Sequence, residues 1–107
     1  MNVYINDESL LELLRDGYTT NKKYRKLPKD VIRGYVKAVQ HIKAVNRIED
    51  LYRINSLNYE QLKGNLKGIE SVRCNKRWRL LFKSSTTENS IIITEIYLIE
   101  ISDHYDD

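Results

Sequence analysis

Two stretches of this 107-residue chain hold the side chains best suited to chemistry. Asp103, His104 and Tyr105 follow one another near the C-terminus. A histidine titrates near neutral pH, a tyrosine transfers protons when nearby cations lower its pKa, and an aspartate can orient either ring. The second stretch, residues 63–83, contains seven basic side chains and one acid: Lys63, Lys67, Arg73, Lys76, Arg77, Arg79, Lys83 and Glu70. This density of positive charge predicts a binding place for phosphate.

The alternation of apolar and polar residues within the basic stretch predicts a β-hairpin. A two-residue turn would place the apolar face of one strand opposite the basic face of the other. A three- or five-residue turn instead pairs Cys74 with Trp78 and Val72 with Leu80, so both apolar faces lie on one side of the sheet. We expect this second register. Asn75 suits the turn because asparagine tolerates left-handed backbone angles.

This register makes Arg73 and Arg79 cross-strand neighbours on the other face of the hairpin. Like charges directly opposite each other weaken a strand pair, so the arrangement favours an anion held between two guanidinium groups. The alternative is a solvated basic hairpin whose arginine stems cover apolar surface. If the last strand ends beside the hairpin, Asp103, His104 and Tyr105 face these cations. The group would then have the parts for RNA cleavage without metal: a base for the 2′-hydroxyl, cations for the scissile phosphate and an acid for the leaving 5′-oxygen.

The remaining sequence predicts an α+β fold in the order β-α-α-β-β-β, with two to three helices packed on one side of a small antiparallel sheet. Asp7 is a suitable N-cap for a short helix that Gly17 ends, and Pro28 begins a long amphipathic helix. The other expected segments are a first strand over residues 2–6, a further helical segment over 48–54, a loop over 55–68, a polar turn over 84–90 and a final strand over 91–101. The apolar, β-branched final strand is expected to be central and buried on both faces.

The composition is typical of a soluble globular protein, with 41% hydrophobic and 31% charged residues. The length fits a single domain over residues 1–107. No apolar run approaches the roughly 20 residues of a membrane span, and the N-terminus has neither the basic region nor the cleavage site of a signal peptide. We therefore expect a cytoplasmic protein without a membrane partner.

The small number of cysteine and histidine residues argues against a metal centre. Cys74 is the single cysteine, which rules out an internal disulfide, and only His41 and His104 could supply imidazole ligands. Cys74 is expected to be a buried hydrophobic residue rather than a nucleophile. We expect neither a metal ion nor a cofactor.

The net charge of +3 is distributed unevenly along the chain. Residues 84–107 contain six acids and no lysine or arginine, in contrast with the basic stretch before them. A local basic patch beside an acidic tail favours a polyanionic ligand bound at one site, or an acidic protein partner. Residues 18–27 form a second basic segment around Tyr24 that could extend the anion site.

Three spaced motifs between residues 62 and 105 resemble one protein family. They are Leu62-Lys63-Gly64, the pattern S-V-R-x-N-x-x-W-R-L-x-F over residues 71–82 and E-I-S-D-H-Y over residues 100–105. In this order they resemble the HigB-type toxins of the RelE/ParE superfamily, also called plasmid maintenance killer proteins. The resemblance implies a RelE-like fold and a type II toxin that enters the ribosomal A site and cuts mRNA. It also implies a HigA-like helix-turn-helix antitoxin, through which alone the toxin would reach operator DNA.

The resemblance assigns roles to the residues of both stretches. The phosphate-contacting lysine and arginines of the family correspond to Lys63, Arg73 and Arg79. The C-terminal proton-transfer cluster of the family corresponds to Asp103, His104 and Tyr105. The remaining basic side chains that are expected to bind RNA are Lys67, Lys76 and Arg77. Better-known members end in Asp-Tyr-His, whereas this chain reads Asp-His-Tyr, so either ring could be the base.

Two other functions are compatible with the same sequence. A ParE-like module would bind a protein target such as DNA gyrase and cleave nothing, because one fold can carry different functions. A degenerate relative would retain only antitoxin binding and operator repression. The terminal Asp-His-Tyr favours cleavage, since a pure binding module has no need of proton-transfer groups there.

Overall fold

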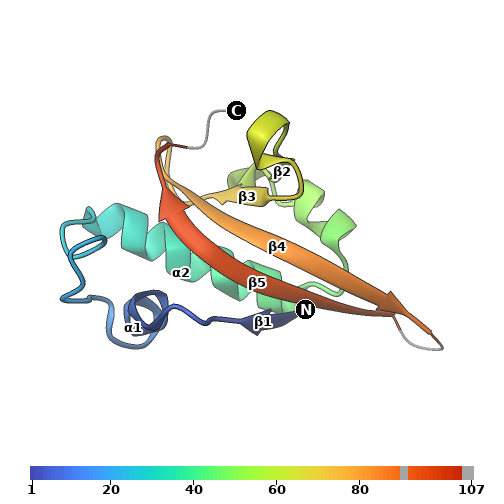
Figure 1. Ribbon diagram of the computed structural model, residues 1–107, viewed down its shortest axis with the longest axis horizontal. Coiled ribbons are helices and arrows are strands. Elements are labelled where there is room, and N and C mark those ends of the chain that lie inside the picture. Colours follow the sequence, from blue (N-terminus) through green and yellow to red (C-terminus); the bar gives the residue numbers. More distant parts are fainter. Residues whose placement is uncertain (90–91, 105–107) are drawn as a thin grey trace.

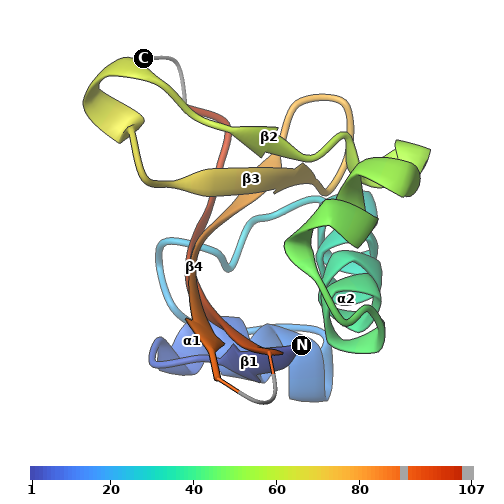
Figure 2. The same cartoon turned by 90° about the vertical axis from the view of Figure 1, so that its right-hand side faces the viewer.

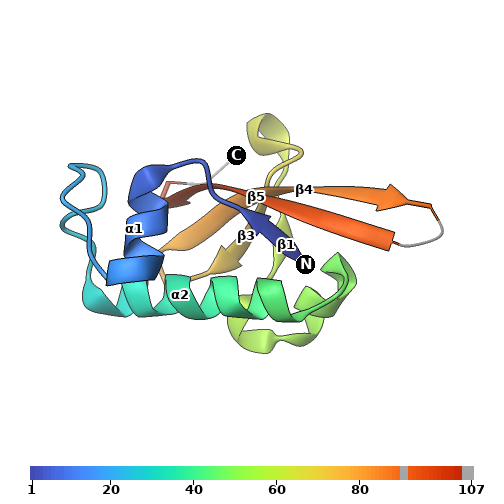
Figure 3. The ribbon, with the colours of Figure 1, turned by 90° about the horizontal axis from the view of Figure 1, so that it is seen from below.

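The computed structural model describes residues 1–89 and 92–104. Within these residues, the long helix α2 (Lys29–Ala44) covers one face of a five-stranded sheet, and the short helix α1 (Glu8–Asp16) packs against α2 (Figure 1, Figure 3). The strands are β1 (Asn2–Tyr4), β2 (Glu60–Gln61), β3 (Glu70–Arg73), β4 (Arg79–Glu88) and β5 (Ile92–Ser102). The connection from α2 to β3 contains the short 3₁₀ helices η1 (Ile48–Arg53), η2 (Asn55–Leu57) and η3 (Gly64–Leu66). The predicted α+β class is confirmed.

The strand order is β1-β5-β4-β3-β2, and the expectation of an antiparallel sheet is wrong at one edge. β1 runs parallel to β5, with Asn2 opposite Glu95 and Tyr4 opposite Tyr97. The chain passes through both α-helices before it enters the sheet again, so a long crossover rather than a tight turn sets the direction of β1. At the other edge, β2 forms where a loop was expected and pairs with β3.

Both α-helices begin at the predicted capping residues. Asp7 Oδ1 accepts the backbone N–H of Ser9 at 2.8 Å and that of Leu10 at 3.3 Å. Gly17 follows α1 with φ of 79°, a left-handed conformation that glycine adopts without strain. Pro28 directly precedes α2, where its missing N–H leaves no hydrogen bond unmade. No helix of the described residues has the length and apolar character needed to cross a membrane.

The hairpin of β3 and β4 has the predicted register. Val72 is the Cα partner of Leu80, and the backbone N–H of Cys74 donates to the carbonyl of Trp78 at 2.9 Å. Val72 and Leu80 are fully buried, and Cys74 and Trp78 pack against the same core. The apolar sides of both strands therefore face α2 together.

Asn75 stabilises the turn through its side chain, and not through the expected left-handed backbone. Its Oδ1 accepts the backbone N–H of Arg77 at 2.9 Å and that of Trp78 at 2.7 Å. Its Nδ2 donates to Asp30 in the first turn of α2 at 3.0 Å. Among the described residues other than glycine, the left-handed conformation is found at Asn58.

The hairpin of β4 and β5 is longer than expected and extends beyond the helices (Figure 1). Residues 84–88 were predicted to be a polar turn, but they continue β4 and pair with β5. The prediction that the final strand is buried on both faces is also wrong for the first half of β5, where Ile92 and Ile93 are exposed. No helix among the described residues covers this part of the sheet (Figure 1), and the two strands pair with each other from Ser84 and Ile96 to Glu88 and Ile92. Ile91, part of the same expectation, lies outside the described residues.

The core lies between the sheet and the helices. Its fully buried members from both layers include Leu10, Leu13, Val31, Tyr35, Ile42, Val72, Leu80, Phe82 and Ile96. The hydroxyl of Tyr35 donates to the carbonyl of Leu10 at 2.8 Å, which joins α2 to α1. The hydroxyl of Tyr24 accepts the N–H of Ile101 at 3.3 Å, and Lys23 lies 2.9 Å from Glu100. The basic segment over residues 18–27 therefore covers the edge of β5 beyond β1.

Gly34 allows the closest contact between α2 and the hairpin. A Cβ atom at this position would lie 1.8 Å from the carbonyl oxygen of Cys74 and 2.6 Å from its carbonyl carbon. Both are backbone atoms, which cannot move aside by a side-chain rotation.

We expect Gly34→Ala to lower the free energy of unfolding by roughly 2 kcal/mol or more, because the new methyl group must push α2 away from the hairpin. At an unobstructed helix position the same substitution would raise stability by about 1 kcal/mol. Urea unfolding followed by circular dichroism measures the change. Gln40→Ala, on the exposed side of α2, is the control and should change stability by less than about 0.5 kcal/mol. A Gly34→Ala variant as stable as the wild type would contradict the packing.

We expect the Cys74 thiol to react slowly with a thiol reagent in the folded protein. Burial raises its pKa to about 12, so the reactive thiolate is scarcer at pH 8 than in the unfolded chain, where a cysteine titrates near pH 8.5. Labelling with Ellman's reagent should accelerate at least tenfold on unfolding in urea. Equal rates in the two states would contradict the predicted burial of Cys74.

Candidate active site

Three residues form a row across the sheet beside the end of the chain. Arg73 of β3 is the Cα partner of Arg79 of β4, and Arg79 is the partner of Ser102 of β5. Their neighbours Leu80 and Ile101 are buried in the core beneath α2. Because side chains alternate along a strand, the row lies on the face turned away from α2, which we call the open face.

The two arginines of this row have different environments. Arg73 is exposed, whereas Arg79 is only 3% exposed. Arg79 Nε donates to Ser71 Oγ at 2.9 Å, and its Nη2 donates to the carbonyl of Asn58 and lies 3.9 Å from a carboxylate oxygen of Glu60. The predicted pairing of the two residues is confirmed, but Arg79 lies within a network that joins β4 to β3 and the segment before β2. Arg73 is the one that solvent reaches.

Asp103 and His104 extend from the β5 end of the row. Asp103 is 13% exposed at its side chain and lies 3.3 Å from Nε of Arg77 and 3.3 Å from Nε2 of His104. The backbone N–H of His104 donates to Ser102 Oγ at 2.9 Å, which turns the chain at the strand end. The His104 side chain is 91% exposed. Tyr105, the third member of the predicted cluster, lies outside the described residues.

Lys63 and Lys67 flank η3, in the loop between β2 and β3. This loop lies on the side of the sheet opposite α2 (Figure 2, Figure 3). Glycines with positive φ, Gly64 at 62° and Gly68 at 93°, allow its tight path. However, the loop joins the Glu70 end of β3, and Arg73 is at the other end, roughly 10 Å along the strand. Arg73 and Arg79 therefore lie in the row that ends at Ser102, the residue before Asp103 and His104, and the two lysines lie at the other end of β3.

Lys76 and Arg77 occupy the turn of the β3–β4 hairpin, and both are exposed. The ion pair between Arg77 and Asp103 connects this turn to the end of β5. The basic side chains thus form two groups, one in the hairpin turn, which contacts Asp103, and one in the lysine loop.

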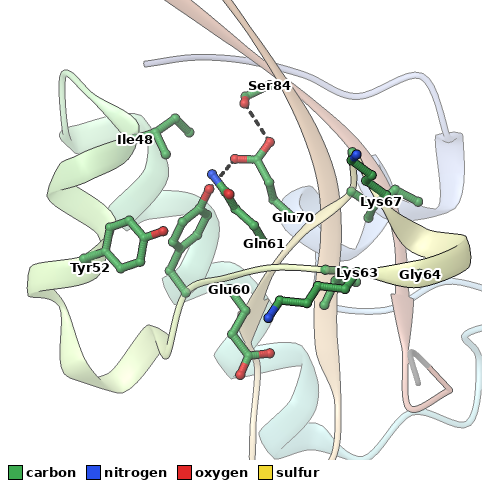
Figure 4. A pocket seen from close by; sticks show the side chains of 13 residues that line it. Ile48, Tyr52, Glu60, Gln61, Lys63, Gly64, Lys67, Glu70 and Ser84 are labelled. Carbon is green, nitrogen blue, oxygen red and sulfur yellow. Dashed lines mark hydrogen bonds between the residues drawn. The ribbon is translucent and has the colours of Figure 1, made fainter. Parts of the chain in front are cut away.

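A cavity of about 1120 Å³ opens at the β2 edge of the sheet, and we call it the edge cavity (Figure 4). Its lining includes Ile48, Tyr52, Tyr59, Gln61, Lys63, Lys67, Glu70 and Ser84. Glu70 is 7% exposed and accepts hydrogen bonds from the Tyr59 hydroxyl at 2.5 Å and from Ser84 Oγ at 2.6 Å. Burial and the neighbouring Glu70 raise the pKa of Tyr59, so the phenol stays protonated and donates.

The sequence interpretation did not single out this cavity. Glu70 was visible only as the single acid of the basic stretch, and Tyr52 and Tyr59 as residues of the connecting segment. Within residues 1–89 and 92–104, no group of three or more His, Cys, Asp and Glu side chains is placed to hold a metal ion.

Comparison with known proteins identifies the family. A family model described as the RelE-like toxin of type II toxin-antitoxin system HigB matches residues 8–100. Toxin HigB-1 of Vibrio cholerae serotype O1 is 31% identical over 70 residues, which are 65% of this chain and 74% of that toxin.

Two solved structures share the fold. The YoeB/ParE toxin from Agrobacterium tumefaciens has a TM-score of 0.57 at 16% identity, over 98% of this chain and 100% of its own. A chain of the YoeB-YefM complex from Staphylococcus aureus has a TM-score of 0.52 at 19% identity, over 98% of each chain. The predicted RelE-like fold is therefore confirmed. Since the family model covers most of its length, the chain belongs to the HigB-like family of RelE-like toxins and is the toxin component of a type II toxin-antitoxin system.

Proposed function

We propose that this toxin is a ribosome-dependent, metal-independent endoribonuclease that cuts mRNA in the ribosomal A site. One observation supports the proposal: the exposed Arg73 lies on the open face in a row with Arg79 and Ser102, and Asp103 and His104 directly follow Ser102. A cation and a side chain that can take up and release a proton are what cleavage by the RNA's own 2′-hydroxyl requires.

The reaction assigns a separate task to each side chain. A base, His104 or Tyr105, takes the proton of the 2′-hydroxyl, and the 2′-oxygen attacks the adjacent phosphorus. The bond from phosphorus to the 5′-oxygen breaks, and that oxygen receives a proton from the acid. The products are a 2′,3′-cyclic phosphate and a 5′-hydroxyl end. Arg73 stabilises the charge on the phosphoryl oxygens, where a cation acts most strongly in the transition state.

The remaining residues position these groups and the RNA. Arg79, buried among its hydrogen-bond partners, holds β4 against β3 and adds positive potential beside Arg73. Asp103 orients the His104 ring, to which it is already adjacent. Neighbouring phosphates along the strand would contact the two basic groups described above, Lys63 and Lys67 in the lysine loop and Lys76 and Arg77 in the hairpin turn. All four side chains are exposed.

The family implies partners for this activity. We propose a HigA-like helix-turn-helix antitoxin as the inhibitor, with operator DNA bound only through it. The toxin would act in the cytoplasm, where translating ribosomes are found. A ParE-like toxin that binds DNA gyrase is the alternative, and the first experiment below separates the two.

Arg73→Ala should reduce mRNA cleavage roughly 100-fold, because removal of one group that stabilises transition-state charge has a cost of this size. Cleavage is measured by mapping mRNA 5′ ends after induced expression of the toxin. The control is Arg33→Ala, an equally exposed arginine on α2, which should cleave at the wild-type rate. Growth arrest by the wild-type toxin with intact mRNA would refute the proposal and favour a protein target.

The double variant His104→Ala, Tyr105→Ala should produce no new mRNA 5′ ends, because both candidates for the base are removed. His41→Ala, at the C-terminal turn of α2, is the matched control and should leave cleavage unchanged. The two single variants then assign the base: loss of the base should reduce cleavage as far as the double variant does, and loss of the other ring should leave part of it. Cleavage by the double variant at more than a tenth of the wild-type rate would exclude the assigned roles.

A further inference from the structure

The edge cavity contains groups that the proposed reaction does not use. Tyr52 is 58% exposed although its ring is large and mostly apolar. It meets Tyr59 edge to face, with ring centroids 4.8 Å apart and an interplanar angle of 87°. Tyr59 is itself buried, and its ring packs on the ring of Phe82, with the two ring centroids 6.2 Å apart. The Tyr52 ring is thus supported from inside the protein while more than half of it faces solvent, as in aromatic platforms on which nucleic-acid bases stack.

Glu70 gives this cavity a hydrogen-bond acceptor of fixed orientation. Tyr59 and Ser84 each donate to a different oxygen of its carboxylate, as the dashed lines in Figure 4 show. A carboxylate offers roughly four acceptor positions, and these hydrogen bonds occupy two of them. Exocyclic amino groups of cytosine, adenine and guanine donate to carboxylates. Uracil has no amino group, and its single ring N–H lies between two carbonyl oxygens that a carboxylate repels.

The lysine loop provides the charge for a phosphate at the mouth of the same cavity. Lys63 and Lys67 line it together with Gly64 and Gly68, and both lysines are exposed. The volume of about 1120 Å³ is no smaller than that of typical small-molecule sites. The loop lies on the side of the open face (Figure 2), whereas Glu70, opposite Phe82, points to the face of the core. An RNA strand from His104 would therefore pass Lys63 and turn around the β2 edge to reach the cavity.

We propose that the edge cavity binds one nucleotide of the RNA, with its base stacked on Tyr52, its amino group on Glu70 and its phosphate on Lys67. The identity of this RNA as substrate rests on the proposed function. The inference adds a base preference at one position near the cut: cytosine, adenine or guanine over uracil.

The test measures the binding of free mononucleotides to the purified toxin. Binding is monitored by NMR titration in the absence of ribosomes. We expect 5′-CMP to bind about tenfold more tightly than 5′-UMP, the discrimination of one good base contact. Tyr52→Ala should weaken 5′-CMP binding about tenfold, and Tyr52→Phe should preserve it, because stacking needs only the ring. Tyr18→Ala, which removes another exposed tyrosine, is the matched control and should have no effect.

Two further variants separate the contacts. Lys67→Ala should weaken the binding of 5′-CMP but not the binding of cytidine, which lacks the phosphate. Glu70→Gln should abolish the preference for 5′-CMP over 5′-UMP, and its thermal unfolding shows whether the fold is kept. Equal affinity for 5′-CMP and 5′-UMP, or full binding by Tyr52→Ala, would overturn the inference.

The outcome is independent of the cleavage experiments. If the toxin binds 5′-CMP selectively but leaves mRNA intact, the nucleotide site in the cavity is supported and the nuclease function is refuted. If the toxin cuts mRNA but binds no mononucleotide selectively, the nuclease function is supported and only the nucleotide site is refuted.

Discussion

The pairing register between β3 and β4 is the constraint on which the rest of the structure depends. With Val72 opposite Leu80, both apolar sides face α2, and Arg73 and Arg79 must then share the open face. Because successive side chains point to opposite faces, a slip of one residue would put the arginines into the core. Asn75 prevents such a slip by closing the turn with its side chain. The stability of the core and the placement of the cations thus have one origin.

Arg79 shows how this sheet accommodates a buried charge. An unpaired guanidinium group at 3% exposure would be strongly destabilising, yet this one donates to Ser71 and to the carbonyl of Asn58 and lies near Glu60. The same contacts fix the left-handed turn at Asn58, from which the chain enters β2. Arg79 therefore connects the row beside the chain end to the segment that forms the edge cavity. Removal of its side chain would disturb both places, so Arg73 is the clearer probe of phosphate binding.

The helices cover one face of the sheet, and the residues proposed to bind and cut RNA lie outside the covered part. α2 covers the face that contains the core (Figure 2). The basic residues of the hairpin turn and the lysine loop, together with Arg73, are exposed. In the proposed mechanism, the proton-transfer groups stand at the end of β5, and the RNA extends toward β2. Cleavage and base preference would then reside in different elements. A substitution in the edge cavity could change the sequence that is cut without removing the cutting groups.

The sequence by itself determined the elements whose causes are local. Capping by Asp7 predicted the start of α1, and the alternation around the turn predicted the register, because one residue of slip exposes a whole apolar face. The spaced motifs predicted the family. Only the tertiary structure decided the parallel direction of β1, the length of the projecting hairpin, the close contact at Gly34 and the burial of Arg79. Each of these depends on which distant segment lies opposite, and neither spacing nor propensity along the chain contains that information.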